Sequence, residues 1–106
     1  MSSHLAVIYT TFPSQEDALN TTHQLLDKRL IACINILGST KSIYYWKGTI
    51  HTCEEVAVFL KTTKDKVSST ITALQKLHPD ETPAILEISI DQAAEPFKQW
   101  IQNTVK

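Results

Sequence analysis

Along the chain, short extended runs of apolar residues typical of strands alternate with apolar residues at helical spacing. Each change from one pattern to the other marks the start of a new predicted element. Residues 5–11 are apolar and β-branched and end before Pro13, which is typical of a buried strand. From Ser14, a favourable N-cap residue, apolar side chains recur at helical spacing as far as Leu30. Acidic residues in the first turn and basic residues near the end suit the helix dipole. The pattern therefore predicts a strand followed by a helix.

The middle of the chain predicts a long hairpin. Residues 31–36 and 42–46 have the character of extended strands, and Lys47-Gly48 has that of a tight turn, because glycine adopts positive φ without strain. Residues 49–63 then return as a long strand, and the segment 56–60 is apolar on both of its faces. We expect helices to cover one face and a partner chain the other.

The last third of the chain predicts a helix, a strand and a final helix. Asp65 is placed to cap a helix whose apolar stripe runs to Leu77, and His78-Pro79 ends it. Residues 84–90 alternate between apolar and polar side chains, as in a strand. A final helix over residues 93–104 is expected to bury Phe97, Trp100 and Ile101, with Val105 directly after it as a further candidate for burial.

The order of elements is β-α-β-β-α-β with a C-terminal helix, which is the ferredoxin-like pattern of an α+β protein. Such a fold has an antiparallel sheet with both main helices on one face. The other face would stay bare in a single chain, so the pattern also predicts an assembly. The length of 106 residues fits one domain over residues 1–106.

Charge and cysteine content narrow the classes of function. The net charge is −1, with 10 basic and 11 acidic residues and no run of Lys or Arg, so the footprint of a nucleic-acid-binding protein is missing. The chain has no run of about eighteen apolar residues, so no membrane span is predicted. The start of the chain does not have the pattern of a secretory signal. The whole chain has two cysteines, Cys33 and Cys53. These features favour the reducing cytoplasm.

Three stretches carry a resemblance to a known family: residues 28–36 (KRLIACINI), residues 42–48 (SIYYWKG) with the strand that follows to Thr62, and residues 78–83 (HPDETP). In this order and at these spacings they resemble the CutA divalent-cation-tolerance proteins, over Leu5 to Trp100. The resemblance implies a ferredoxin-like subunit in a compact homotrimer joined through the edge strands of its sheets. It also implies a link to copper and other divalent cations, and an architecture similar to that of the PII signalling proteins.

The chain departs from the family pattern at three positions. Asp80 stands where the family usually has Tyr after His-Pro. Thr10 and Leu77 stand where some bacterial members have a Cys and a second His. In such members the Cys and the second His contribute to a proposed copper site, together with the His that corresponds to His78. Of these three ligands, only His78 is present in this chain.

His78 is the first candidate for a metal ligand, since imidazole is the commonest ligand near neutral pH and the end of a helix can leave it exposed. Asp80 and Glu81 are close enough in the sequence to contribute oxygen ligands to copper or another divalent cation. The alternative is that His78 only terminates the helix. No organic cofactor is expected.

His51 and Cys53 form a second candidate pair, because alternate residues of a strand point to the same face. Chance proximity on an exposed surface is the alternative. Cys53 has the acidic neighbour Glu54 and is expected to be accessible. Cys33 lies among apolar residues and is expected to be a buried, unreactive thiol.

A third group combines aromatic and charged residues that could line an intersubunit cleft: Tyr44, Tyr45, Trp46, Glu55 and Lys61. The alternative is that the aromatic rings pack across a subunit interface, whose core such residues favour.

No phosphate-binding glycine loop, nucleophile elbow or Cys-x-x-Cys pair is present, so the sequence favours a protein that is not an enzyme. Together with the cytoplasmic features above, the resemblance implies a trimeric divalent-cation-tolerance protein that binds copper or another divalent ion and contributes to the metal-ion response. Neither nucleic acid nor membrane is expected as a partner. The alternative function is a PII-like regulatory trimer that senses a small ligand in intersubunit clefts.

Overall fold

The structure is a computed structural model that describes residues 4–106. Residues 1–3, where the predicted domain begins, lie outside the described residues. The elements are β1 (Leu5–Phe12), α1 (Gln15–Asp27), β2 (Cys33–Trp46), β3 (Thr49–Thr63), a 3₁₀ turn (Lys64–Lys66), α2 (Val67–Leu77), β4 (Ile85–Ile90) and α3 (Glu95–Thr104). This order confirms the predicted β-α-β-β-α-β pattern with a C-terminal helix. None of the described helices is long and apolar enough to cross a membrane.

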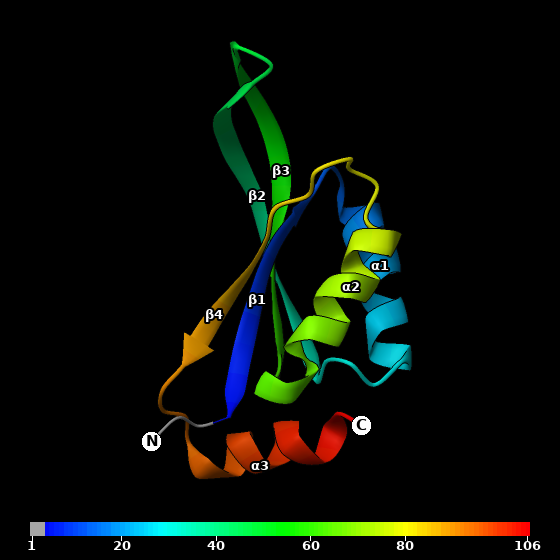
Figure 1. Cartoon of the computed structure of the whole chain (residues 1–106), viewed down its shortest axis with the longest axis vertical. Coiled ribbons are helices and arrows are strands. Elements are labelled where there is room, and N and C mark those ends of the chain that lie inside the picture. The colour runs from blue at the N-terminus through cyan, green and yellow to red at the C-terminus, as the bar shows by residue number, and fades with distance from the viewer. Residues whose placement is uncertain (1–3) are drawn as a thin grey trace.

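The four strands form one antiparallel sheet in the order β2-β3-β1-β4. Helices α1 and α2 pack side by side on one face of this sheet, and α3 crosses its lower end (Figure 1). The main core lies between the sheet and the two helices, where several large side chains are fully buried: Ile8, Phe12, Leu25, Leu60 and Leu74. Burial of each such side chain contributes roughly 1.5–3 kcal/mol. The core therefore holds α1 and α2 to this face alone.

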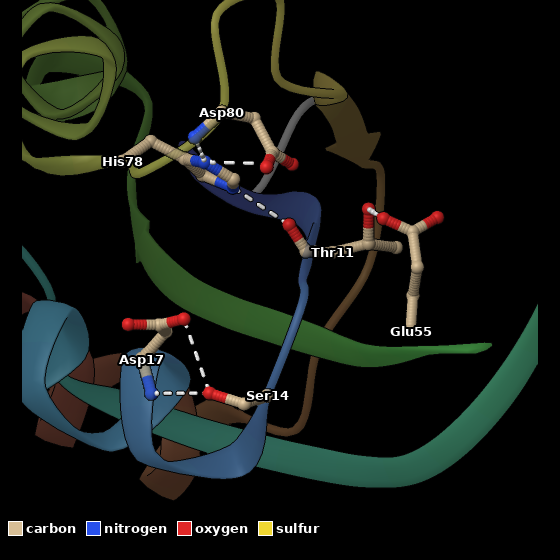
Figure 2. Close-up of polar contacts among 6 residues, drawn as sticks. All are labelled: Thr11, Ser14, Asp17, Glu55, His78 and Asp80. Carbon is tan, nitrogen blue, oxygen red and sulfur yellow. Dashed lines mark hydrogen bonds and ion pairs between the residues drawn. The ribbon is translucent and has the colours of Figure 1, made fainter. Parts of the chain in front are cut away.

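The N-terminus of α1 begins as the sequence predicts. The Oγ atom of Ser14 accepts a hydrogen bond from the backbone N–H of Asp17 at 3.1 Å and donates one to Oδ2 of the same residue at 3.0 Å (Figure 2). This cap satisfies one of the free N–H groups of the first turn. It fixes where the chain leaves β1 and therefore where the helix meets the sheet.

Strands β2 and β3 are 14 and 15 residues long, whereas β1 and β4 have 8 and 6. The pairing of β1 with β3 ends at Phe12 and Val56, so the rest of the hairpin projects beyond the sheet as an arm (Figure 1). The predicted turn is confirmed, with Lys47 and Gly48 both at positive φ (51° and 80°). The strand predicted in two pieces is continuous and has a bulge at Leu37.

The sheet face away from α1 and α2 is called the open face below. Strand register places on it the odd-numbered residues of β1 and β3 and the even-numbered residues of β4. The rings of Tyr9 and Phe59 meet there edge to face at 6.1 Å. Leu86 and Ile88 are 60% and 43% exposed. The strand that is apolar on both faces is therefore covered by its own chain on one face only.

Two local expectations are wrong. Asp65 does not cap α2, because it lies in the 3₁₀ turn and accepts a hydrogen bond from the Thr63 hydroxyl, while α2 has no side-chain cap. Phe97 and Trp100 are not buried, since α3 contacts the body of the protein along a narrow stripe. Ile101 and Val105 occupy that stripe as expected, in a cluster with Leu5, Ala32, Ile90 and Ala93.

Two buried threonines allow a matched test of the polar core. Among the described residues, Thr10 Oγ1 is a buried polar atom without a hydrogen-bond partner, whereas Thr62 Oγ1 donates to the Leu30 carbonyl at 2.6 Å. We expect Thr10→Val to raise the free energy of unfolding by about 1 kcal/mol and Thr62→Val to lower it by a similar amount. Denaturant unfolding at one fixed protein concentration measures both. Equal destabilisation by the two variants would contradict the assignment.

Candidate functional site

A cleft lies on the open face between the base of the hairpin arm and the segment that joins α2 to β4. Its volume is about 730 Å³. The lining residues come from β1 and its end (Tyr9, Thr11, Pro13), the hairpin (Ser42, Ile43, Tyr44, Trp46, Cys53, Glu54, Glu55) and the joining segment (Asp80, Glu81, Thr82, Ala84). The site is therefore built from three segments that are far apart in the sequence.

Thr11 connects the two walls of this cleft. Its backbone carbonyl accepts a hydrogen bond from His78 Nε2 at 2.6 Å, and its hydroxyl donates to Glu55 Oε2 at 3.1 Å (Figure 2). The first bond ties the joining segment to β1, and the second orients a carboxylate of the hairpin. The bond to His78 is buried and the bond to Glu55 is partly buried, and together they position the walls relative to each other.

His78 is buried rather than exposed, which corrects the expectation from its place at the end of a helix. Its Nδ1 atom accepts a hydrogen bond from the backbone N–H of Asp80 at 3.0 Å, and its ring stacks on Phe12 at 4.5 Å. The proton is therefore on Nε2, which donates to Thr11. With both ring nitrogens engaged, His78 ends the helix and anchors the segment behind the cleft. It could coordinate a metal only if one of these bonds were broken.

Four of the lining side chains are carboxylates, and none of the lining residues is Lys, Arg or His. Lys41 Nζ lies 3.7 Å from Glu54 Oε1, in an exposed pair that contributes little. Asp80 Oδ2 lies 3.8 Å from Nδ1 of the neutral His78. Glu81 has no hydrogen bond or ion pair with the described residues. The cleft is therefore acidic, and its carboxylates are only partly engaged within the chain.

The hairpin wall is aromatic. The Tyr44 hydroxyl lies 3.6 Å from Cys53 Sγ. The hydrogen bond with Cys53 raises the pKa of Tyr44, and the charges of the Glu55 and Asp80 carboxylates raise it further. The ring of His51 stacks on Tyr44 at 6.0 Å, on the same hairpin face as Cys53. His51 is exposed and is not among the residues that line the cleft.

The structure brings together only part of the third predicted group. Tyr44, Trp46 and Glu55 line the cleft, but Tyr45 pairs with Ile50 on the opposite face of the hairpin. Lys61 lies at the far end of the sheet, where its Nζ atom sits 5.4 Å from the centre of the Phe97 ring. Tyr45 is not among the lining residues, and distance along β3 excludes Lys61 from the cleft.

Cys33 was expected to be buried, and this is wrong for the single chain. It is half-buried on the open face, as is Cys53 on the hairpin. Burial raises the pKa of the Cys33 thiol, and the charge of the cross-strand neighbour Lys61 partly offsets this effect. Partial burial of Cys33 therefore disfavours its thiolate form, which makes it a poor nucleophile.

The sequence predicts two groups of metal ligands, His78 with Asp80 and Glu81, and His51 with Cys53. The structure brings only some of these residues together. Asp80 and Glu81 line the same cleft as Cys53, whereas His78 lies behind it and His51 outside it. Within residues 4–106, no three His, Cys, Asp or Glu side chains are grouped to hold one ion. A single chain in this conformation therefore offers acidic ligands but no complete coordination shell.

Sequence reasoning missed Tyr9 and Thr11. Nothing in the linear pattern shows that the end of β1 lies under the base of the hairpin, because that neighbourhood depends on the order of strands in the sheet. The available signal was alternation within residues 5–11, which places Tyr9 and Thr11 on the face opposite the core residues Ile8 and Thr10.

Comparison with known proteins agrees with this architecture. Residues 6–104 match the family model described as CutA1 divalent ion tolerance protein. The chain is 40% identical over 101 residues to the divalent-cation tolerance protein CutA of Thermotoga maritima, covering 95% of this chain and 99% of that protein. It is 36% identical over 102 residues to the protein of the same name from Pyrococcus horikoshii, covering 96% and 99%.

Solved structures show the same fold. The crystal structure of the divalent ion tolerance protein CutA1 from Ehrlichia chaffeensis superposes with a TM-score of 0.91 at 40% identity, over 95% of this chain and 94% of that chain. The match of the family model over nearly the whole chain, the full-length relatives and the shared fold lead to one conclusion. This chain belongs to the CutA1 family of divalent ion tolerance proteins.

Proposed function

We propose that this chain acts as a single domain in a homotrimer that binds a divalent cation, Cu(II) in particular, and contributes to the tolerance of such ions. The observation that carries the proposal is the acidic cleft, in which Asp80 and Glu81 of the joining segment face the same space as Cys53, Glu54 and Glu55 of the hairpin. The relatives are named for divalent-cation tolerance, which supports the same proposal.

The open face supports assembly with further copies. Tyr9, Phe59, Leu86 and Ile88 form an apolar surface that α1 and α2 do not cover. The radius of gyration is 14.4 Å, above the roughly 13 Å of a compact chain of about 100 residues, because the hairpin arm projects. Exposed apolar side chains occur on both faces of this arm: Ile43, Tyr45 and Ile50 lie on one face, and Tyr44 and Trp46 lie on the other. Neighbouring copies would bury both surfaces.

Copper suits the chemistry of the cleft. Cu(II) leads the affinity order of divalent first-row ions for a given set of ligands. Carboxylates from two walls can supply oxygen ligands, and Cys53 lies beside them. Since one chain offers no complete shell, the ion is a bound cargo whose remaining ligands are water or donors from a neighbouring copy. An affinity on the order of micromolar is appropriate for such a set.

The alternative functions have less support. The comparisons identify a cation-tolerance family and do not support the PII-like alternative. A role without catalysis remains part of the proposal, since the family is named for cation tolerance and not for a reaction. Cytoplasmic location also stays a prediction, resting on the two thiols.

Assembly gives the first test of this proposal. We expect a mass near three times 11.9 kDa by light scattering at micromolar concentration. Leu86→Glu should shift the protein to monomer, because burial of an unpaired carboxylate in an interface costs several kcal/mol. Leu19→Glu is the matched control, since Leu19 is an exposed leucine on α1. A parent protein of monomeric mass would contradict the proposed trimer.

Copper binding gives the second test. Calorimetry should show Cu(II) bound more tightly than Zn(II) or Ni(II), with affinity falling as the pH is lowered, because protons compete for the ligands. Glu81→Gln should weaken Cu(II) binding about tenfold through loss of a charged oxygen ligand. Glu16→Gln, an exposed carboxylate on α1, should change nothing. His78→Ala is unsuitable here, because it would also release the joining segment. Equal binding by the Glu81 variant and the parent would refute this site.

A further inference from the structure

The cleft has features that a metal ion alone does not require. Its volume of about 730 Å³ falls within the range of about 300–1,000 Å³ that is usual for small-molecule sites. Tyr9, Tyr44 and Trp46 give its lining an aromatic component beside the four carboxylates. Because no basic residue is among the lining residues, the cleft is suited to a ligand that is positively charged and partly apolar.

The carboxylates are divided between two walls. Glu54 and Glu55 are on β3, whereas Asp80 and Glu81 are on the segment after α2. Glu55 uses Oε2 for the bond with Thr11, and no described residue bonds to its Oε1. Glu81 is not paired with any described residue. Each wall therefore retains a carboxylate oxygen for an external donor, and a ligand that satisfies both walls needs two cationic ends.

The aromatic rings favour alkylammonium groups. An ammonium group within about 6 Å of a ring centre is attracted by the negative face of the ring, most strongly by Trp. The chain itself provides an example, since Lys47 Nζ lies 5.9 Å from the centre of the Trp46 ring. Lys47 is exposed at the tip of the hairpin and does not line the cleft. The apolar surfaces of the rings also suit the methylene groups between two ammonium ends.

From this arrangement we propose that the cleft binds an organic dication of the aliphatic diamine class. One ammonium group is held at the wall of Glu54 and Glu55 and the other at the wall of Asp80 and Glu81, with the alkyl chain against Tyr44 and Trp46. Thr11 orients the first wall and, through His78, holds the second. The proposal concerns the same cleft as the copper proposal, but it stands whether or not a metal ion binds.

The test uses the fluorescence of Trp46. The chain has two tryptophans, and Trp100→Phe leaves Trp46, which lines the cleft, as the only reporter. The protein is titrated with 1,4-diaminobutane in the presence of EDTA and at constant ionic strength. We expect a saturable change in Trp46 emission, with binding about tenfold tighter than that of 1-aminobutane because the second ammonium group engages the second wall. 1,4-Butanediol, which has the same length and no charge, should give no change.

Variants assign the contacts. In the Trp100→Phe background, Glu55→Gln and Glu81→Gln should each weaken diamine binding about threefold, since each removes one charge from a different wall. Tyr44→Leu should weaken it by a similar factor through loss of the ring face. Glu16→Gln changes the net charge by the same amount outside the cleft and should leave binding unaltered.

Three results would overturn the inference. The first is no saturable signal from a folded protein of unchanged mass, which would mean that a neighbouring copy fills the cleft. The second is equal weakening by Glu16→Gln and Glu81→Gln, which would show attraction to net charge only. The third is equal affinity for the diamine and the diol. Because EDTA removes metal ions, none of these results depends on whether copper binds.

Discussion

An antiparallel sheet with two apolar faces and helices for only one of them sets the main constraint on this protein. Strand β3 runs through the centre of the sheet and has apolar side chains toward both faces. Helices α1 and α2 bury one face, and the short contact of α3 covers only the end of the other. The remaining apolar surface stays exposed to water in the single chain, so its burial would lower the free energy. Association with further copies of the same chain would bury this surface.

The length of the hairpin has a second consequence. Because β2 and β3 continue beyond the point where β1 ends, the open face passes from a sheet into a projecting arm. The segment after α2 lies beside this step and closes the cleft. Thr11 is at the junction, with a carbonyl bonded to His78 and a hydroxyl bonded to Glu55. One residue at the end of a strand therefore links the stability of the joining segment to the orientation of a carboxylate in the cleft.

The elements of the fold could be predicted from the sequence because their signals are local. Alternation, helical spacing, the Ser14 cap and the Lys47-Gly48 turn each depend on neighbours in the chain, and each is confirmed. The Asp65 cap fails locally, because a 3₁₀ turn places its carboxylate on the Thr63 hydroxyl, whereas the other wrong expectations depend on how distant segments pack. Phe97 has an apolar side chain in an amphipathic helix, and its spacing does not show how narrow the contact with the sheet is.

The candidate site was predictable in chemistry but not in geometry. Asp80, Glu81 and Cys53 were identified as possible ligands, and they do line one cleft. The sequence could not show that His78 turns inward, because its partners, the Thr11 carbonyl and the Asp80 N–H, are backbone groups with no signature in residue type. Lys61 is expected beside Tyr44, Trp46 and Glu55, but the length of β3 separates it from the cleft.

The inward position of His78 also clarifies what the cleft can select. An exposed imidazole would have provided a strong, directional ligand and would have favoured transition metals. With that imidazole used as a structural anchor, the accessible donors are carboxylates, a thiol and a tyrosine hydroxyl, set beside aromatic rings. Carboxylates attract cations of many kinds, so charge alone gives little discrimination. Discrimination among organic cations must then come from the size of the cleft and from its aromatic rings.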